Sequence, residues 1–147
     1  MLRSFLIFLL IGFAAFTGFG QSRYSDDVNS DGKDDKWFSV NSQGEVDMEE
    51  DRNFDGTVDC KVNLDGLGRA TYEEFDENYD GKMDTFFYYK KGALNKQEID
   101  SNFDGKVDIW VYLIEGIYIQ RYEVDKDFDG VVDKVKDYSP AEMKKKG

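Results

Sequence analysis

The chain has 147 residues, with 31 acidic and 19 basic side chains and a formal net charge of −12 at pH 7. This balance excludes nucleic acid as an expected partner, because phosphate backbones are bound by basic surfaces. The chain has no histidine and a single cysteine, Cys60, which excludes an intrachain disulfide and a thiolate zinc site. Its 12 Phe, 9 Tyr and 2 Trp exceed what disordered acidic chains contain, so we expect a folded protein.

Residues 1–20 have the organisation of a secretory signal peptide. Arg3 gives a positive start, a nearly unbroken apolar run follows at 5–15, and small residues precede a cleavage point before Gln21. The apolar run is short for a membrane span, and an uncleaved N-terminal anchor is the alternative. We therefore expect a protein that is secreted, periplasmic or held at the cell surface. We expect no stable membrane span after cleavage, and a domain at 21–138.

A nine-residue acidic motif, D-x-[ND]-x-D-G-x-x-D, occurs five times in this domain. The copies occupy 27–35, 51–59, 76–84, 100–108 and 125–133, so their first residues lie 24 or 25 positions apart. One copy is a weak signal, whereas five copies in step predict a repeat array. Position 4 is aromatic and position 8 is aliphatic in four of the five copies, and we expect these side chains to pack against the body of the protein.

Each segment between two acidic motifs is predicted to contain two short strands. Stretches such as KWFSV at 36–40, TFFYYK at 85–90 and IWVYLI at 109–114 are rich in aromatic and β-branched residues. A turn that contains glycine follows each of them, and a second strand leads to the next acidic motif. With a short strand before the first motif, this predicts an all-β antiparallel meander of five two-stranded repeats of about 24 residues.

Alternation along each strand assigns the side chains to two faces. The side chains three and five positions after each closing aspartate form the predicted core face: Phe38 and Val40, Val62 and Leu64, Phe87 and Tyr89, Val111 and Leu113. The opposite face is mixed and carries several aromatic side chains. The sheet could curl into a barrel around the apolar face or remain open. The Ser139-Pro140-Ala141-Glu142 sequence is typical of a helix start and predicts a short C-terminal helix within the tail at 139–147.

The acidic motifs have the composition of a calcium loop. Ca²⁺ takes six to eight oxygen ligands, and a D-x-N-x-D run can direct several oxygens to one point if the chain turns sharply. The glycine at position 6 permits such a turn because it accepts a positive φ. Positions 1, 3, 5 and 9 would supply side-chain oxygens and position 7 a backbone carbonyl. Because loops 1 to 4 each crowd at least three carboxylates together, a cation would relieve their repulsion.

The first half of the motif resembles the calcium loop of the EF-hand family. The second half departs from it, because position 12 is Phe38, Val62, Phe87, Val111 or Lys136, and none of these is the bidentate glutamate of an EF-hand. The motif is closer to the D-x-D-x-D-G-x-x-D loops of integrin-type β-propeller repeats, which join two strands. The resemblance covers the loops alone, and what it implies is Ca²⁺ as cofactor and a ligand role for each motif position.

The predicted metal ligands follow from these positions, five from each copy of the motif. They are Asp27, Asn29, Asp31, Lys33 and Asp35; Asp51, Asn53, Asp55, Thr57 and Asp59; Asp76, Asn78, Asp80, Lys82 and Asp84; Asp100, Asn102, Asp104, Lys106 and Asp108; and Asp125, Asp127, Asp129, Val131 and Asp133. Asp127 stands where the other copies have asparagine, and we expect the fifth copy to bind most tightly.

Two functional hypotheses follow from the sequence. The first is an exported calcium-binding protein with a structural or adhesive role, whose loops are rigidified by Ca²⁺. The second is a module that binds a glycan or protein ligand through an exposed aromatic face. Ordinary Asp-Gly turns are the alternative for any single motif, but they do not account for aspartate at position 9 in all five. An enzyme is not expected, because the repeat already accounts for every aspartate cluster.

Overall fold

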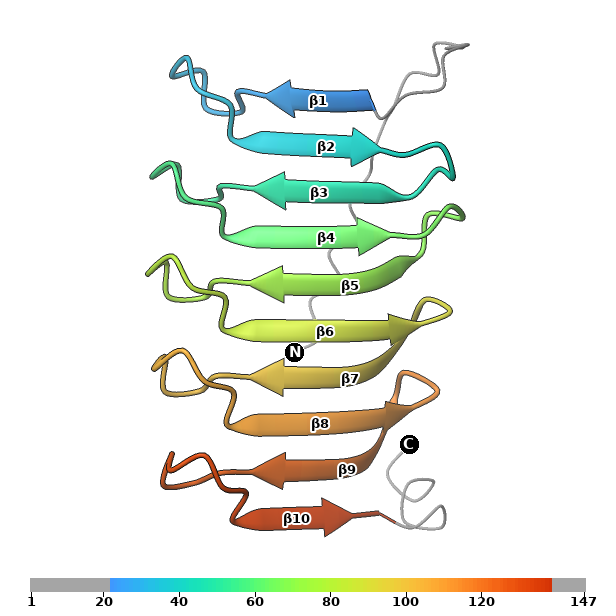
Figure 1. The fold of residues 1–147 in the computed structure, drawn as a ribbon, viewed down its shortest axis with the longest axis vertical. Coiled ribbons are helices and arrows are strands. Elements are labelled where there is room, and N and C mark those ends of the chain that lie inside the picture. The colour runs from blue at the N-terminus through green and yellow to red at the C-terminus, as the bar shows by residue number, and fades with distance from the viewer. Residues whose placement is uncertain (1–21, 139–147) are drawn as a thin grey trace.

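The computed structural model describes residues 22–138, which form one sheet of ten antiparallel strands (Figure 1). The strands are β1 Ser22–Asp26, β2 Lys36–Val40, β3 Val46–Glu50, β4 Cys60–Leu64, β5 Ala70–Phe75, β6 Thr85–Lys90, β7 Ala93–Ile99, β8 Ile109–Ile114, β9 Tyr118–Val124 and β10 Lys134–Asp137. Each strand pairs with its neighbours in sequence, so β1 and β10 are the two edges. The predicted all-β meander is confirmed, and the sheet is open.

The connections alternate between the two ends of the strands, and this places all five acidic motifs along one border of the sheet (Figure 1). We number these connections loop 1 (27–35), loop 2 (51–59), loop 3 (76–84), loop 4 (100–108) and loop 5 (125–133). The tight turns lie along the opposite border. The meander therefore stacks the loops in chain order, each separated from the next by one hairpin.

The hydrophobic core is small and lies on the predicted core face. Among residues 22–138, the buried hydrophobic side chains are Met48, Cys60 and Val62, and Phe38, Leu64 and Phe75 pack against them. Most other strand side chains on both faces are half-buried, because no second layer covers either face within these residues. Hydrophobic burial is thus a weaker source of stability here than in a two-layer domain.

The predicted packing of the loop side chains is half right. At position 8, Val58, Met83, Val107 and Val132 are half-buried, as expected. At position 4 the expectation is wrong, since Phe54, Tyr79, Phe103 and Phe128 are 41–46% exposed. The reason is the backbone: position 4 is left-handed in all four loops, and the N–H groups of Phe54, Tyr79 and Phe128 donate to the carboxylate at position 1.

Two predictions concern segments outside the described residues, namely the signal peptide at 1–20 and the helix within 139–147. Within 22–138, nothing helical has the length and hydropathy of a membrane-spanning segment.

Candidate metal centre

The five acidic loops share one backbone conformation. Position 4 is left-handed in every loop, with φ between 62° and 64°, and the glycine at position 6 has φ between 87° and 95°. A left-handed backbone costs a residue other than glycine about 1 kcal/mol. That cost recurs at the same position in all five loops, so a common set of interactions must offset it.

The carboxylate at position 1 supplies most of these interactions. In loop 3, Asp76 is 0% exposed, and its Oδ1 accepts the N–H of Tyr79 at 2.6 Å. Its Oδ2 accepts the N–H of Gly81 at 2.7 Å. The glycine N–H donates to the position 1 carboxylate in all five loops, at 2.6–2.8 Å. The carboxylate at position 1 thus sits inside a ring of backbone N–H groups and holds the sharp turn.

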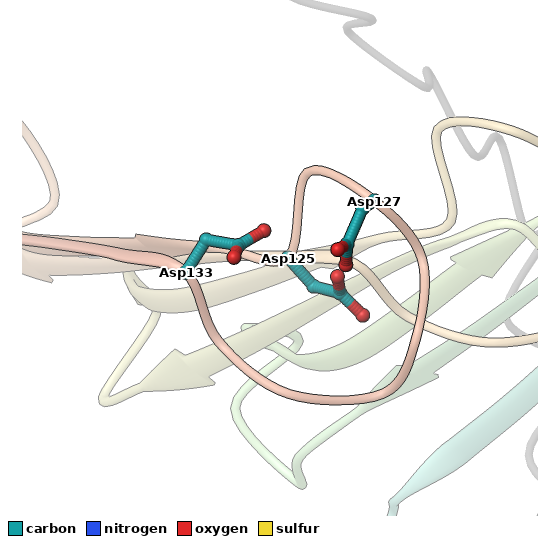
Figure 2. A group of neighbouring side chains, drawn as sticks. All are labelled: Asp125, Asp127 and Asp133. Carbon is teal, nitrogen blue, oxygen red and sulfur yellow. The ribbon is translucent and has the colours of Figure 1, made fainter.

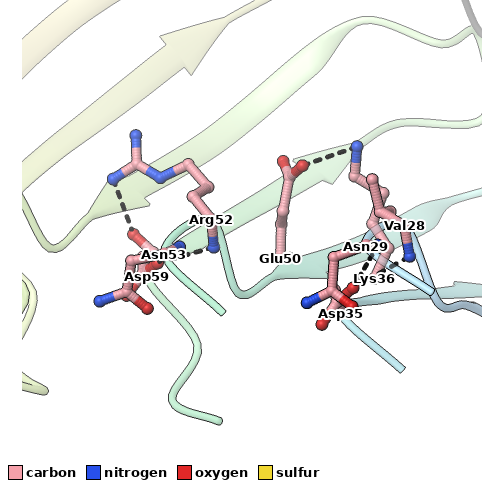
Figure 3. A network of polar contacts seen from close by, with 8 residues as sticks. All are labelled: Val28, Asn29, Asp35, Lys36, Glu50, Arg52, Asn53 and Asp59. Carbon is pink, nitrogen blue, oxygen red and sulfur yellow. Dashed lines mark hydrogen bonds and ion pairs between the residues drawn. The ribbon is translucent and has the colours of Figure 1, made fainter. Parts of the chain in front are cut away.

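The carboxylate at position 9 closes the other side of each loop. Its Oδ2 accepts the N–H of position 2 in all five loops, at 2.7–2.9 Å. Figure 3 shows this for Asp35, which accepts from Val28 and Asn29, and for Asp59. The side chains of Asp35, Asp59, Asp84 and Asp108 are 1–3% exposed, whereas Asp133 is exposed.

One of these buried carboxylates has an unused oxygen. Oδ1 of Asp59 is buried and has no hydrogen-bond partner within residues 22–138. Burial raises the pKa of the Asp59 carboxyl, and the same cause raises the pKa of Asp84. An unpartnered buried carboxylate oxygen is costly, and a cation beside it would remove the cost.

Positions 3 and 5 are coupled to each other at the exposed side of the loop. In loops 1 to 4 the asparagine Oδ1 accepts the N–H of position 5, at 2.8–3.1 Å. Its Nδ2 donates to the carboxylate of position 5, at 2.9–3.3 Å. The bond from Asn53 is the main cause that lowers the pKa of Asp55. In loop 2, Asn53 therefore stabilises the charged form of the Asp55 carboxylate.

Loop 5 differs because Asp127 replaces the asparagine. Figure 2 shows the carboxylates of Asp125, Asp127 and Asp133 facing a shared space, and one ligand oxygen from each lies within 4.8 Å of the others. Within residues 22–138, this is the one group of three or more His, Cys, Asp or Glu side chains whose ligand atoms meet so closely. The charges of Asp129 and Asp133 raise the pKa of Asp127. The apposed carboxylates repel one another.

The predicted ligands are therefore gathered to different degrees. Positions 1 and 9 lie inside every loop and are mostly buried. In loops 1 to 4 positions 3 and 5 are bonded to each other at the outer side, whereas in loop 5 the carboxylate of position 3 faces positions 1 and 9. The position 7 residues Lys33, Thr57, Lys82, Lys106 and Val131 donate their N–H groups to the position 5 carboxylates, at 2.8–3.0 Å. A carboxylate has about four acceptor sites, so these bonds leave lone pairs for a cation.

Neighbouring loops are joined directly through their aspartates. The backbone N–H of each opening aspartate, in loops 2 to 5, donates to the carbonyl of the closing aspartate of the preceding loop, at 2.7–2.9 Å. For example, the Asp76 N–H donates to the Asp59 carbonyl at 2.8 Å. We call this series of bonds the aspartate ladder. One backbone hydrogen bond thus connects each candidate site directly to the next.

Sequence reasoning missed one residue that joins two loops. Arg52 of loop 2 extends its guanidinium to loop 3, where Nη2 donates to the Asp76 carbonyl at 2.9 Å. The guanidinium carbon also lies 5.3 Å from the ring centroid of Phe75 and 5.7 Å from that of Tyr79. The available signal was weak, since position 2 varies between loops and Arg52 is the one arginine found there.

The comparisons with known proteins add little to this geometry. No protein-family model matches the chain, and no curated protein matches it. One matching chain of a solved structure comes from the crystal structure of accessory secretory protein 1, 2 and 3 in Streptococcus pneumoniae. The TM-score is 0.44 and the identity 16%, over 75% of this chain and 20% of that chain. The chain therefore spans about a fifth of that protein's length, and the likeness carries no functional argument.

Proposed function

We propose that this chain is an exported calcium-binding repeat protein with a structural or adhesive role, in which Ca²⁺ fixes the acidic loops. The observation that carries the proposal is the convergence of Asp125, Asp127 and Asp133 in loop 5. Three carboxylates with spare acceptor sites around a shared space match the preference of Ca²⁺ for oxygen ligands. The other four loops have the same backbone conformation and an amide oxygen in place of the third carboxylate.

The electrostatics of the loops support the same proposal. Each loop keeps a carboxylate at position 1 and another at position 9, and the members of loops 2 to 4 are almost fully buried. Backbone N–H groups stabilise these charges in part, but Asp59 Oδ1 has no partner and the pKa values of Asp59 and Asp84 are raised. A divalent cation would offset both the repulsion and the burial penalty.

The thin fold gives the cation a structural use. Only three hydrophobic side chains are buried among residues 22–138, and the single cysteine cannot form an intrachain disulfide. Small cores are commonly reinforced by metals or disulfides. Because no loop has a glutamate at position 12, we expect dissociation constants of about 10⁻⁴ to 10⁻³ M, the range of extracellular modules. Such affinities suit an environment rich in calcium, which agrees with export.

Calcium titration by isothermal calorimetry and native mass spectrometry tests the proposal. The matched variants are D127N, which gives loop 5 the asparagine of the other loops, and N102D, which gives loop 4 the aspartate of loop 5. We expect D127N to weaken the tightest site about tenfold, and N102D to create a second site of comparable affinity. D34N is the control, because Asp34 is an exposed loop 1 carboxylate outside the ligand set and its loss removes the same charge. A wild-type chain that binds no calcium, or equal effects of D127N and D34N, would refute the proposal.

One observation favours the second function, a binding module. A hollow of about 570 Å³ lies on the sheet face opposite the core, and Trp37, Tyr72, Asp47 and Glu74 are among its lining residues. Aromatic rings beside carboxylates can bind sugars through stacking and hydrogen bonds. A glycan array probed with wild type and W37A, with and without calcium, tests this function. A defined glycan that W37A no longer binds would support it, and an array without any signal would contradict it.

A further inference from the structure

The two edges of the sheet are complementary halves of one hairpin. Every interior hairpin consists of a strand that follows an acidic loop and a strand that precedes the next loop, as in β2 and β3. Within residues 22–138, the sheet begins with β1, which precedes loop 1, and ends with β10, which follows loop 5. Within residues 22–138, no strand pairs with the outer side of either one. Open strand edges carry unpaired N–H and C=O groups that can pair with another chain.

The interior hairpins define the register that such a pairing would adopt. The residue directly after a closing aspartate always lies opposite the residue directly before the next opening aspartate. The pairs are Lys36 with Glu50, Cys60 with Phe75, Thr85 with Ile99, and Ile109 with Val124. The same rule, applied to β10 of one copy and β1 of the next, pairs Lys134 with Asp26, Lys136 with Tyr24 and Asp137 with Arg23.

The side chains in this register are complementary. Lys134 and Asp26 would occupy the positions of Lys36 and Glu50, whose Nζ and Oε1 atoms form an ion pair of 2.6 Å inside the sheet. A second pair of opposite charge, Asp137 with Arg23, lies on the other face of the same two strands. All four of these edge side chains are exposed.

Pairing of two identical edges is less favourable. Two copies of β10 that pair antiparallel about a two-fold axis would place lysine opposite lysine, whether the axis passes through Val135 or Lys136. Like charges directly opposite each other destabilise a sheet. Two copies of β1 centred on Tyr24 avoid this repulsion but form no ion pair across the edge. The charges thus favour β10 against β1 over either symmetric arrangement.

We propose that β10 of one copy pairs with β1 of a second copy, so that the sheet continues from chain to chain. The contact joins two different surfaces, and it leaves one β1 and one β10 edge free after every addition. Such head-to-tail contacts produce open linear assemblies unless the rotation closes a ring. The proposal rests on strand register and edge charge, and it stands whether or not the loops bind calcium.

Sedimentation velocity and light scattering on the full-length chain, over a wide range of protein concentration, test the assembly. We expect a series of masses that grows with concentration. D26K and K134D each place like charges opposite one another and should lower the association constant about tenfold, which corresponds to about 1.4 kcal/mol. The double variant D26K/K134D restores opposite charges in reversed order and should recover wild-type association, as should an equimolar mixture of the two single variants.

R23E provides an independent variant, because Arg23 lies at the end of β1 away from loop 1. The R23E substitution should weaken association by a similar factor. Circular dichroism on each variant checks that the exposed substitutions leave the sheet intact. A wild-type chain that stays monomeric would overturn the proposal and would assign the edge lysines a protective role. A dimer that grows no further would also overturn it, as would a mass series that none of the charge variants changes.

Discussion

The buried carboxylate at position 1 of loop 3 gives the sharpest test of how these loops are held. Replacing Asp76 by alanine removes the acceptor of two short N–H bonds, from Tyr79 at 2.6 Å and from Gly81 at 2.7 Å, together with a longer one from Asp80. A hydrogen bond to a charged group contributes about 1.5–3 kcal/mol. Water can reach the exposed outer side of the loop and replaces part of the loss. We therefore expect the D76A variant to lose about 3 kcal/mol of unfolding free energy.

The measurement is urea unfolding at pH 7 in the presence of a chelator, so that no bound metal contributes. E77A is the matched control, because Glu77 is the next residue in the same loop, carries the same charge and has an exposed side chain. We expect E77A to change the unfolding free energy by less than about 0.5 kcal/mol. If D76A costs less than about 1 kcal/mol, or no more than E77A, the carboxylate does not hold the turn and this reasoning fails.

Four further predictions concern the metal, the thiol and two interior contacts. Calcium at a hundredfold excess over the dissociation constant of one site adds about 2.7 kcal/mol to the free energy of unfolding, so chelation should lower the Tm by several degrees. An unchanged Tm would contradict calcium binding. Burial raises the pKa of Cys60 to about 11, so iodoacetamide at pH 8 should modify it only after urea unfolds the chain. Burial raises the pKa of the Glu73 carboxyl above 4.5, so the protonated form that favours folding is lost as the pH rises through the folded pKa. The E73Q variant, whose amide oxygen can still accept the Tyr89 hydroxyl, should therefore be more stable than wild type at pH 7 and equally stable near pH 4. An E73Q variant that is less stable than wild type at pH 7 would contradict this. R52A should destabilise the chain by about 1–2 kcal/mol in urea unfolding, whereas R52K, which keeps the charge without the planar fork, should recover less than half of the loss.

The strands could be predicted closely from the sequence. The stretches proposed at 36–40, 85–90 and 109–114 coincide with β2, β6 and β8, because aromatic and β-branched runs bounded by Asp-Gly loops and glycine turns leave little freedom in the bounds. Whether the sheet closes was not predictable, since closure depends on the accumulated twist between strands and not on any local pattern.

The candidate site was predictable in composition but not in its internal bonding. The spacing of the aspartates indicated that they share a loop, yet it did not indicate which of them would be buried. That distinction comes from the backbone N–H groups that point at Asp76 and its equivalents, and from the turn they form. The predicted packing of the position 4 aromatic side chains was wrong for the same reason, because the left-handed backbone at Phe54 is set by the hydrogen bond from its N–H group to Asp51.

The aspartate ladder has a mechanical consequence. Because β1 and β10 lie at opposite ends of the sheet, a force that separates them acts across every strand pair in series (Figure 1). Strands would then peel from an outer edge, and each repeat of 24 or 25 residues would release roughly 80 Å of chain. The bonds of the aspartate ladder join consecutive loops at this border of the sheet, so each of them must break as a repeat is released. Extension under load should therefore proceed in even steps, which would let a tethered chain lengthen gradually without losing its whole fold at once.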